Sequence, residues 1–211
     1  MEQFNTLDIF GPFHVELIHS DQNRIELDYH GIDSENVIAG VSRNTLRLKL
    51  RNKQYFHDWG SESKRRSEYI RAKVYYTDID QINAQAGAIV TTTSQLKSKN
   101  LIIECSMGAE VSLEILSKNF YLKSNMGAIT RLNGYTEYLE VKSSMGGVVK
   151  ATRLQSKVAY VKASMGSEVF VCATDELEVS AGLGAVVDYT GSPTVRHTNS
   201  NLGAEIRSRE Q

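Results

Sequence analysis

The 211-residue sequence has only two cysteines that could cross-link the chain and two prolines that restrict its backbone. It also has a single tryptophan. Cys105 and Cys172 lack the spacing of a metal or redox motif, and they lie on opposite sides of the strand alternation described below. We therefore predict neither a disulfide nor a metal site. A chain of this length buries roughly 70% of its unfolded surface, so it folds without such supports.

The sequence also lacks a charge excess and long apolar runs. Its 24 basic and 25 acidic residues give a formal net charge of −1, which provides no general attraction to nucleic acid. No apolar run approaches the ~18 residues of a membrane-spanning helix. The first residues, Met1–Asn5, carry neither a basic region nor an apolar core of a signal peptide. Export with a removed signal and a cytoplasmic location both remain open.

The most regular feature present is a glycine that recurs, most often within Met-Gly-Ala or a close variant. The intervals between successive copies are 21, 19, 19, 20, 18 and 19 residues. A constant period near 20 indicates one structural unit that is copied and stacked, as in a solenoid. The recurring glycines are Gly87, Gly108, Gly127, Gly146, Gly166, Gly184 and Gly203.

Within each copy, apolar or small residues occupy odd distances from the glycine, whereas polar residues occupy most even distances. Five residues before the glycine, for example, stand Ile103, Leu122, Val141, Val161 and Val179. Alternation with a period of two is typical of β-strands. Because like residues recur at the same distance in each copy, we predict an all-β parallel β-helix with about 19–20 residues per coil and coils ~4.8 Å apart.

The residue before the glycine is methionine in four copies: Met107, Met126, Met145 and Met165. Its odd position predicts that these side chains fill the lumen of the coil, since the flexible thioether suits irregular gaps. Small residues three positions before the glycine predict a narrow corner. The glycine itself is predicted to mark a bend, where a Cβ would clash or where φ must be positive.

We predict one domain over residues 1–211. Residues 1–80 also alternate, but with irregular turn signals, and should form the first coils and a cap; residues 81–208 should form the regular coils. Residues 52–67 interrupt the alternation with aromatic and basic residues that include Trp59. Since binding residues concentrate on loops, Trp59 is a candidate contact residue, although a loop folded back on the rod is the alternative.

The run Phe4–Leu17, the segment Asn44–Leu48 and the repeated Ser-x-Met-Gly-Ala motif resemble the family of putative auto-transporter adhesins called the head GIN domain. The similarity extends from Phe4 to Ile206. It implies a right-handed, single-stranded β-helix, usually exported or lipid-anchored and described as an adhesin without an agreed ligand. It therefore favours the cell envelope or the extracellular space as the location. These motifs specify the fold well and the activity poorly.

The even positions form the predicted outer surface. Lys123, Lys142 and Lys162 stand four residues before successive glycines, whereas Tyr121, Glu140 and Tyr160 stand six before them. If the coils stack, the lysines form one column and the two tyrosines flank Glu140 in a second. Rings that stack on sugars, beside charges that hydrogen-bond them, could hold a polysaccharide. A merely solvated surface is the alternative.

We therefore expect a non-catalytic module that binds a glycan or another envelope polymer, without a cofactor. One alternative is a self-associating scaffold, suggested by Ile129, Val148 and Val186 on a further outer column. A polysaccharide lyase or hydrolase is a weaker alternative, because neither an acidic cluster nor a converging pair of carboxylates is evident in the pattern. No phosphate-binding loop, HExxH or GxSxG motif occurs.

Overall fold

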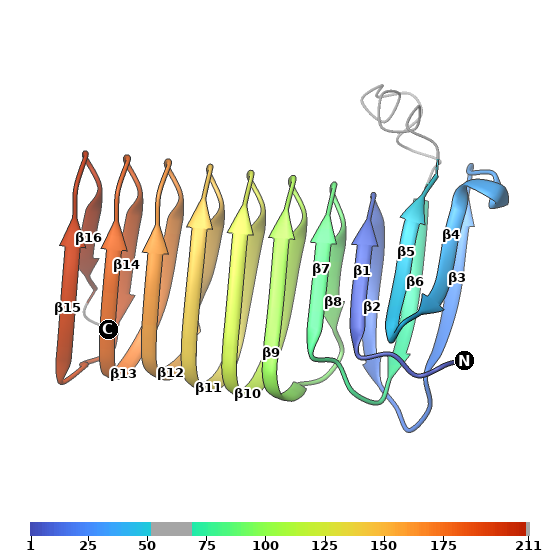
Figure 1. Cartoon of the computed structure of the whole chain (residues 1–211), viewed down its shortest axis with the longest axis horizontal. Helices are drawn as coiled ribbons and strands as arrows, with labels where there is room; N and C mark the ends of the chain where they lie inside the picture. Colours follow the sequence, from blue (N-terminus) through green and yellow to red (C-terminus); the bar gives the residue numbers. More distant parts are fainter. Residues whose placement is uncertain (52–68, 210–211) are drawn as a thin grey trace.

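The computed structural model describes residues 1–51 and 69–209, and the whole predicted loop, residues 52–67 with Trp59, lies outside these ranges. The described residues form a flattened β-solenoid, in which each coil crosses a front sheet, turns at the upper edge and returns through a back sheet (Figure 1). No helix in the described ranges is long and apolar enough to cross a membrane. The all-β parallel solenoid predicted from the repeat is thus confirmed.

The strands become longer and more regular after the first third of the chain. The irregular part comprises β1 (Thr6–Phe10), β2 (Phe13–His19), β3 (Arg24–His30), η1 (Ser34–Asn36), β4 (Val37–Ser42), β5 (Thr45–Leu50), β6 (Tyr69–Tyr76), β7 (Gln81–Gln85) and β8 (Ile89–Thr92). The regular part comprises β9 (Leu96–Ser106), β10 (Glu110–Asn125), β11 (Ile129–Ser144), β12 (Val148–Ala163), β13 (Glu168–Ala181), β14 (Val186–Thr190), β15 (Val195–Ser200) and β16 (Glu205–Ser208).

The first coils do not stack in chain order. In the front sheet β1 lies between β5 and β7, and in the back sheet β2 lies between β6 and β8. The coil made by β5 and β6 therefore lies outside the first coil of the chain. Antiparallel strands close this end, since β4 pairs with β5 and β3 pairs with β6. The predicted cap is present, built from reversed strands that end the parallel stack.

The core is a stack of columns with one member per coil. Leu101, Phe120, Leu139, Ala159 and Leu177 form one fully buried column. The column of small residues is buried too, and it forms the narrow corner that its size predicted. There Ser143 Oγ lies within hydrogen-bond distance of the carbonyl oxygens of Ser124 and Gly147, at 3.1 and 3.2 Å. The buried hydroxyl of Ser143 is thus satisfied by backbone carbonyls within the corner.

The prediction that methionine fills the lumen is wrong. Met107, Met126, Met145 and Met165 are 40–53% exposed. Each has a positive φ of 50–53°. This left-handed turn breaks the two-residue alternation and directs the side chain outward, so the buried upper corner is filled instead by the small residue after each glycine, such as Ala128.

The glycine of the motif is needed for its backbone conformation alone. Gly146 has φ +72°, and an added Cβ would meet no atom within 4 Å. Of the two reasons predicted for the bend, a positive φ is confirmed and a clash is not. Each turn is also tied to the next, as in the hydrogen bond of 3.1 Å that the Gly127 N–H donates to the carbonyl of Met145.

Variation in repeat length is absorbed on one side of the solenoid. The pairing of β11 with β12 shifts register between Arg131 and Asn133, and that of β12 with β13 shifts between Ala151 and Gln155. The segments Asn119–Asn125, Tyr138–Ser143, Val158–Ala163, Glu176–Ala181 and Val195–Ser200 pair in the front sheet without a break. The front sheet therefore presents straight columns of outward side chains.

The two cysteines should differ strongly in reactivity. Cys105 is 1% exposed, and burial raises the pKa of its thiol to about 12, whereas Cys172 is half-buried. Because the thiolate is the reactive form, Cys105 should remain almost unmodified near pH 8. Iodoacetamide labelling followed by peptide mass spectrometry should find Cys172 modified first, with Cys105 reacting only after denaturation. Equal rates in the folded protein would contradict the burial of this column.

Candidate functional site

The outward lysines form the column that the repeat predicted. Lys123 pairs in register with Lys142, and Lys142 with Lys162. Lys142 Nζ lies 2.7 Å from Glu140 Oε1, and Lys123 Nζ lies 3.9 Å from Glu104 Oε2. In the described ranges, no carboxylate lies within salt-bridge distance of Lys162. The column therefore carries positive charge that is only partly neutralised.

A shallow groove of about 770 Å³ runs beside this column near the upper edge. The three lysines line it together with short polar side chains, among them Asn125, Ser144 and Ser164, and with Met145, Leu183 and Leu202 from the turns. The groove spans several coils, so its length suits an extended ligand better than a compact one. Its cations and polar groups can hydrogen-bond anionic or hydroxylated groups.

The predicted column of Tyr121, Glu140 and Tyr160 is also in register. The structure adds Tyr138, whose ring centroid lies 5.8 Å from that of Tyr121 and 5.5 Å from that of Tyr160. The rings are tilted to one another by 50° and 34°. We call Tyr121, Tyr138 and Tyr160 the tyrosine cluster. It joins residues of three successive coils into one aromatic surface.

Two hydroxyl groups of the tyrosine cluster donate hydrogen bonds to carboxylates. Tyr160 donates a hydrogen bond of 2.8 Å to Glu176, and this bond is the main cause of the raised pKa of Tyr160. Tyr138 donates to Glu140 at 3.4 Å, and burial followed by the charge of Glu140 raises its pKa. Both phenols therefore stay neutral, and their bonds restrain the rings. Tyr121 is 38% exposed and offers the most accessible ring.

The columns predicted from the repeat do not include Tyr138, which stands eight residues before Gly146. It lies two residues before Glu140, on the same side of the strand, where the alternation places it. Extending the pattern by one step would have found it. Trp59, the remaining predicted contact residue, lies outside the described ranges.

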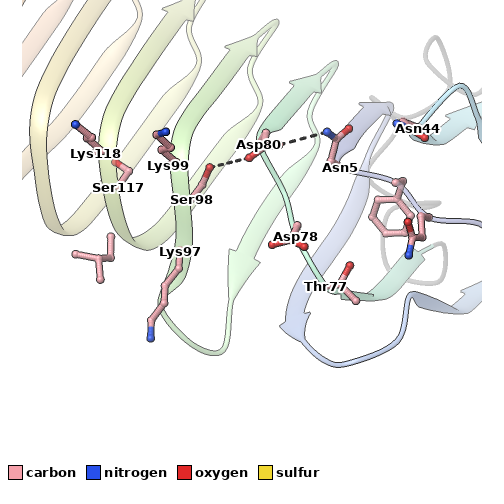
Figure 2. A pocket seen from close by; sticks show the side chains of 13 residues that line it. Asn5, Asn44, Thr77, Asp78, Asp80, Lys97, Ser98, Lys99, Ser117 and Lys118 are labelled. Carbon is pink, nitrogen blue, oxygen red and sulfur yellow. Dashed lines mark hydrogen bonds between the residues drawn. The ribbon is translucent and has the colours of Figure 1, made fainter.

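A second hollow of about 770 Å³ lies at the lower bend, between the first coil and the regular coils (Figure 2). Asp80 lies at its centre and accepts hydrogen bonds of 2.9 Å from Ser98 and 3.3 Å from Asn5. Its backbone also bonds both neighbours, through Asn5 and Ile102. Lys97 extends away from Lys99 and Lys118 in Figure 2, so the cations do not converge. The hydrogen bonds of Asp80 connect two neighbouring coils, and we therefore assign the residues around this hollow a structural role.

The predicted apolar patch on the back sheet is only half exposed. Ile129, Val148 and Val186 pair in the expected column with Glu110, Glu168 and Glu205, but all three are of intermediate burial. Asp188, further along the back sheet, is 2% exposed and lies 2.6 Å from the Arg209 guanidinium. In the described ranges no three His, Cys, Asp or Glu side chains lie close enough to hold a metal ion.

The comparisons with known proteins agree with this architecture. A crystal structure of a putative adhesin from Bacteroides fragilis matches with a TM-score of 0.78 at 18% identity, covering 99% of this chain and 93% of that one. A putative lipid binding protein from Parabacteroides distasonis matches with a TM-score of 0.69 at 15% identity, covering 99% and 94%. At such low identities, the TM-scores show a shared fold and nothing further.

A putative adhesin from Parabacteroides merdae gives a TM-score of 0.62 at 13% identity, covering 99% of this chain and 93% of that one. No curated protein matches the sequence. The model of one protein family matches residues 3–193, which is most of the chain. The chain therefore belongs to the family described as putative auto-transporter adhesin, head GIN domain.

Proposed function

We propose that this protein is a non-catalytic adhesion module of the cell envelope that binds an anionic glycan on its front sheet. The observation that carries the proposal is the position of the tyrosine cluster beside the lysine-lined groove, on the most regular surface of the solenoid. Aromatic rings pack against the apolar faces of sugars, and lysines bind their carboxylates or sulfates. Membership in a family described as adhesins supports a binding role.

The geometry favours a polymer over a single sugar. Successive coils are ~4.8 Å apart, so the three lysines span ~10 Å. A polysaccharide lying along the solenoid axis would meet a cation on each of three coils and a ring on the strand segments beside them. Because the turns and strands are tied by backbone hydrogen bonds, this surface is rigid before the ligand binds, which lowers the entropic cost of binding.

Replacing Tyr138 and Lys142 together by alanine should weaken binding of polygalacturonate roughly thirtyfold or more, since each side chain contributes about 1 to 1.5 kcal/mol. Isothermal titration calorimetry measures the affinity, and a glycan array identifies better ligands. The double variant Tyr135→Ala/Lys150→Ala is the matched control. Its tyrosine lies at the lower bend and its lysine on the back sheet, so affinity should be unchanged. A blank array for the wild type, or equal losses in both variants, would refute the proposal.

A further inference from the structure

One exposed apolar side chain per coil lies along the upper edge of the solenoid. These side chains occupy equivalent turns, and we call them the turn ridge. They are 40–72% exposed, so their apolar surface is not accounted for by packing in the core. The members of the turn ridge are Met107, Met126, Met145, Met165, Leu183 and Leu202.

The choice of residue at these turns is costly for the fold. Each member of the ridge has φ between +49° and +53°, a conformation in which asparagine or glycine is favoured and a larger side chain is strained. A single exposed apolar residue would need no explanation. Six in one row, each at a strained position, form a continuous apolar edge of a kind that marks an interaction site.

The ridge is straight and firmly held. Its turns are linked by hydrogen bonds of 3.0–3.1 Å between successive coils, from the N–H of each glycine to the carbonyl of the next ridge residue. With coils ~4.8 Å apart, six residues span ~24 Å. A straight apolar edge of this length can lie along a flat surface over all its coils at once.

The charges beside the ridge indicate which flat surface it fits. On the front side, the groove is lined both by Lys123, Lys142 and Lys162 and by ridge residues. On the back side, the column next to the turns combines glutamates with Ile129, Val148 and Val186. Two of its three glutamates are neutralised, since Glu110 pairs with Arg131 at 3.0 Å and Glu205 pairs with Arg207. The apolar edge therefore has a cationic side at the front and a side with little net charge at the back.

We propose that the turn ridge docks on the surface of an anionic lipid bilayer. The methionine and leucine side chains would enter the boundary between headgroups and acyl chains, while the three lysines would contact lipid phosphates. The three lysines that flank the ridge favour an anionic surface as the occupant. A second copy of the chain is the alternative outcome that the ultracentrifugation described below detects. This proposal shares the three lysines with the proposed glycan site, but it rests on the ridge residues, none of which belongs to the tyrosine cluster.

The test uses the triple variant Met126→Asn/Met145→Asn/Met165→Asn in a vesicle sedimentation assay. Vesicles are an equimolar mixture of phosphatidylcholine and phosphatidylglycerol, with phosphatidylcholine alone for comparison. We expect the wild type to bind the mixed vesicles preferentially and the triple variant to bind at least ~10-fold more weakly, because three of the six inserted apolar side chains are removed from the centre of the ridge. Each lysine replaced by alanine should weaken binding by ~5-fold, and added salt should act in the same direction.

Asparagine suits the left-handed turn, so the variant should keep the melting temperature of the wild type. If the triple variant does not fold, Met145→Asn alone provides the same comparison with a smaller loss. The matched control is Leu116→Thr/Val195→Thr, which removes two apolar side chains that are 39% and 45% exposed but lie in strands away from the ridge. This control should bind vesicles as the wild type does.

Three results would overturn the proposal. These are failure of the wild type to bind mixed vesicles, equal binding by the triple variant, and a dimer seen by analytical ultracentrifugation that the triple variant abolishes while vesicle binding is absent. The last result would assign the ridge to self-association. Tyr138→Ala should weaken glycan binding and leave vesicle binding intact. The two proposals can therefore fail separately.

Discussion

Replacing Gly134 by alanine should destabilise the protein more than the same replacement at Gly146, the central glycine of a repeated motif. Gly134 has φ +112°, which a residue with a side chain rarely adopts, and an added Cβ would overlap the backbone carbonyl of Ile115 on the adjacent coil. That carbonyl cannot withdraw without breaking the ladder between β10 and β11. We expect a loss of about 4 kcal/mol or more, which lowers the melting temperature by roughly 10 °C.

Gly146→Ala is the matched control for this prediction. Its φ of +72° is similarly unfavourable for alanine, but an added Cβ would meet no atom within 4 Å. The cost should be only about 1 kcal/mol, which reflects the backbone alone. Thermal melts followed by circular dichroism compare the two variants directly. If both alanine variants were destabilised equally, the predicted overlap between the Cβ at position 134 and the Ile115 carbonyl would be contradicted.

Phe120→Ala should also cost about 3–5 kcal/mol. Phe120 is fully buried, and the adjacent members of its column, Leu101 and Leu139, are fully buried as well. In a globular core, neighbours can partly collapse into the space that a smaller residue leaves. Here the neighbours sit on strands whose spacing is set by backbone pairing on both sides of β10. The cavity should therefore remain, and the loss should fall near the upper end of this range.

Phe120→Leu provides the comparison, because leucine already occupies this column at positions 101, 139 and 177. It should cost about 1.5 kcal/mol or less, as conservative core exchanges do. Urea titrations report both values. Unfolding of a stacked protein can proceed coil by coil, so two probes should be compared to confirm a single transition. If Phe120→Ala cost no more than Phe120→Leu, the column would have to be loosely packed.

Much of this fold could be predicted because stacking copies each repeat position into a column. The lysine pairing of Lys123, Lys142 and Lys162 needed only the spacing of the glycines, and the structure has that register. The column containing Phe120 followed from alternation and is buried as expected. In both cases a local two-residue period acts with a constant interval between copies.

The methionines could not be placed by the same argument, because alternation holds only while the backbone stays extended. A positive φ at Met145 and at the following glycine reverses the chain and directs the methionine outward. The glycine itself is the sequence signal for this turn, and the turn also requires a positive φ at the residue before it. Recognising a two-residue left-handed turn would have moved the four methionines from the core to the surface.

The stacking order of the first coils could not be predicted from the sequence either. Whether β1 stacks beside β5 or beside β7 depends on long-range pairing, and the structure shows that it pairs with both. The strands Arg24–His30 and Val37–Ser42 reverse direction to cap the stack, and nothing in their local alternation distinguishes antiparallel from parallel pairing. Repeats predict the regular coils well because each neighbour is known, and the non-repeating end lacks that information.

The central claim is that the lysine column of the front sheet is a binding surface, and lysine footprinting tests it most directly. The protein is acetylated under limiting conditions with and without polygalacturonate, and each site is quantified by mass spectrometry. We predict protection of Lys123, Lys142 and Lys162, with unchanged labelling of the exposed lysines Lys118, Lys150 and Lys157 away from this column. Uniform protection of all six, or protection confined to the latter three, would contradict the assignment.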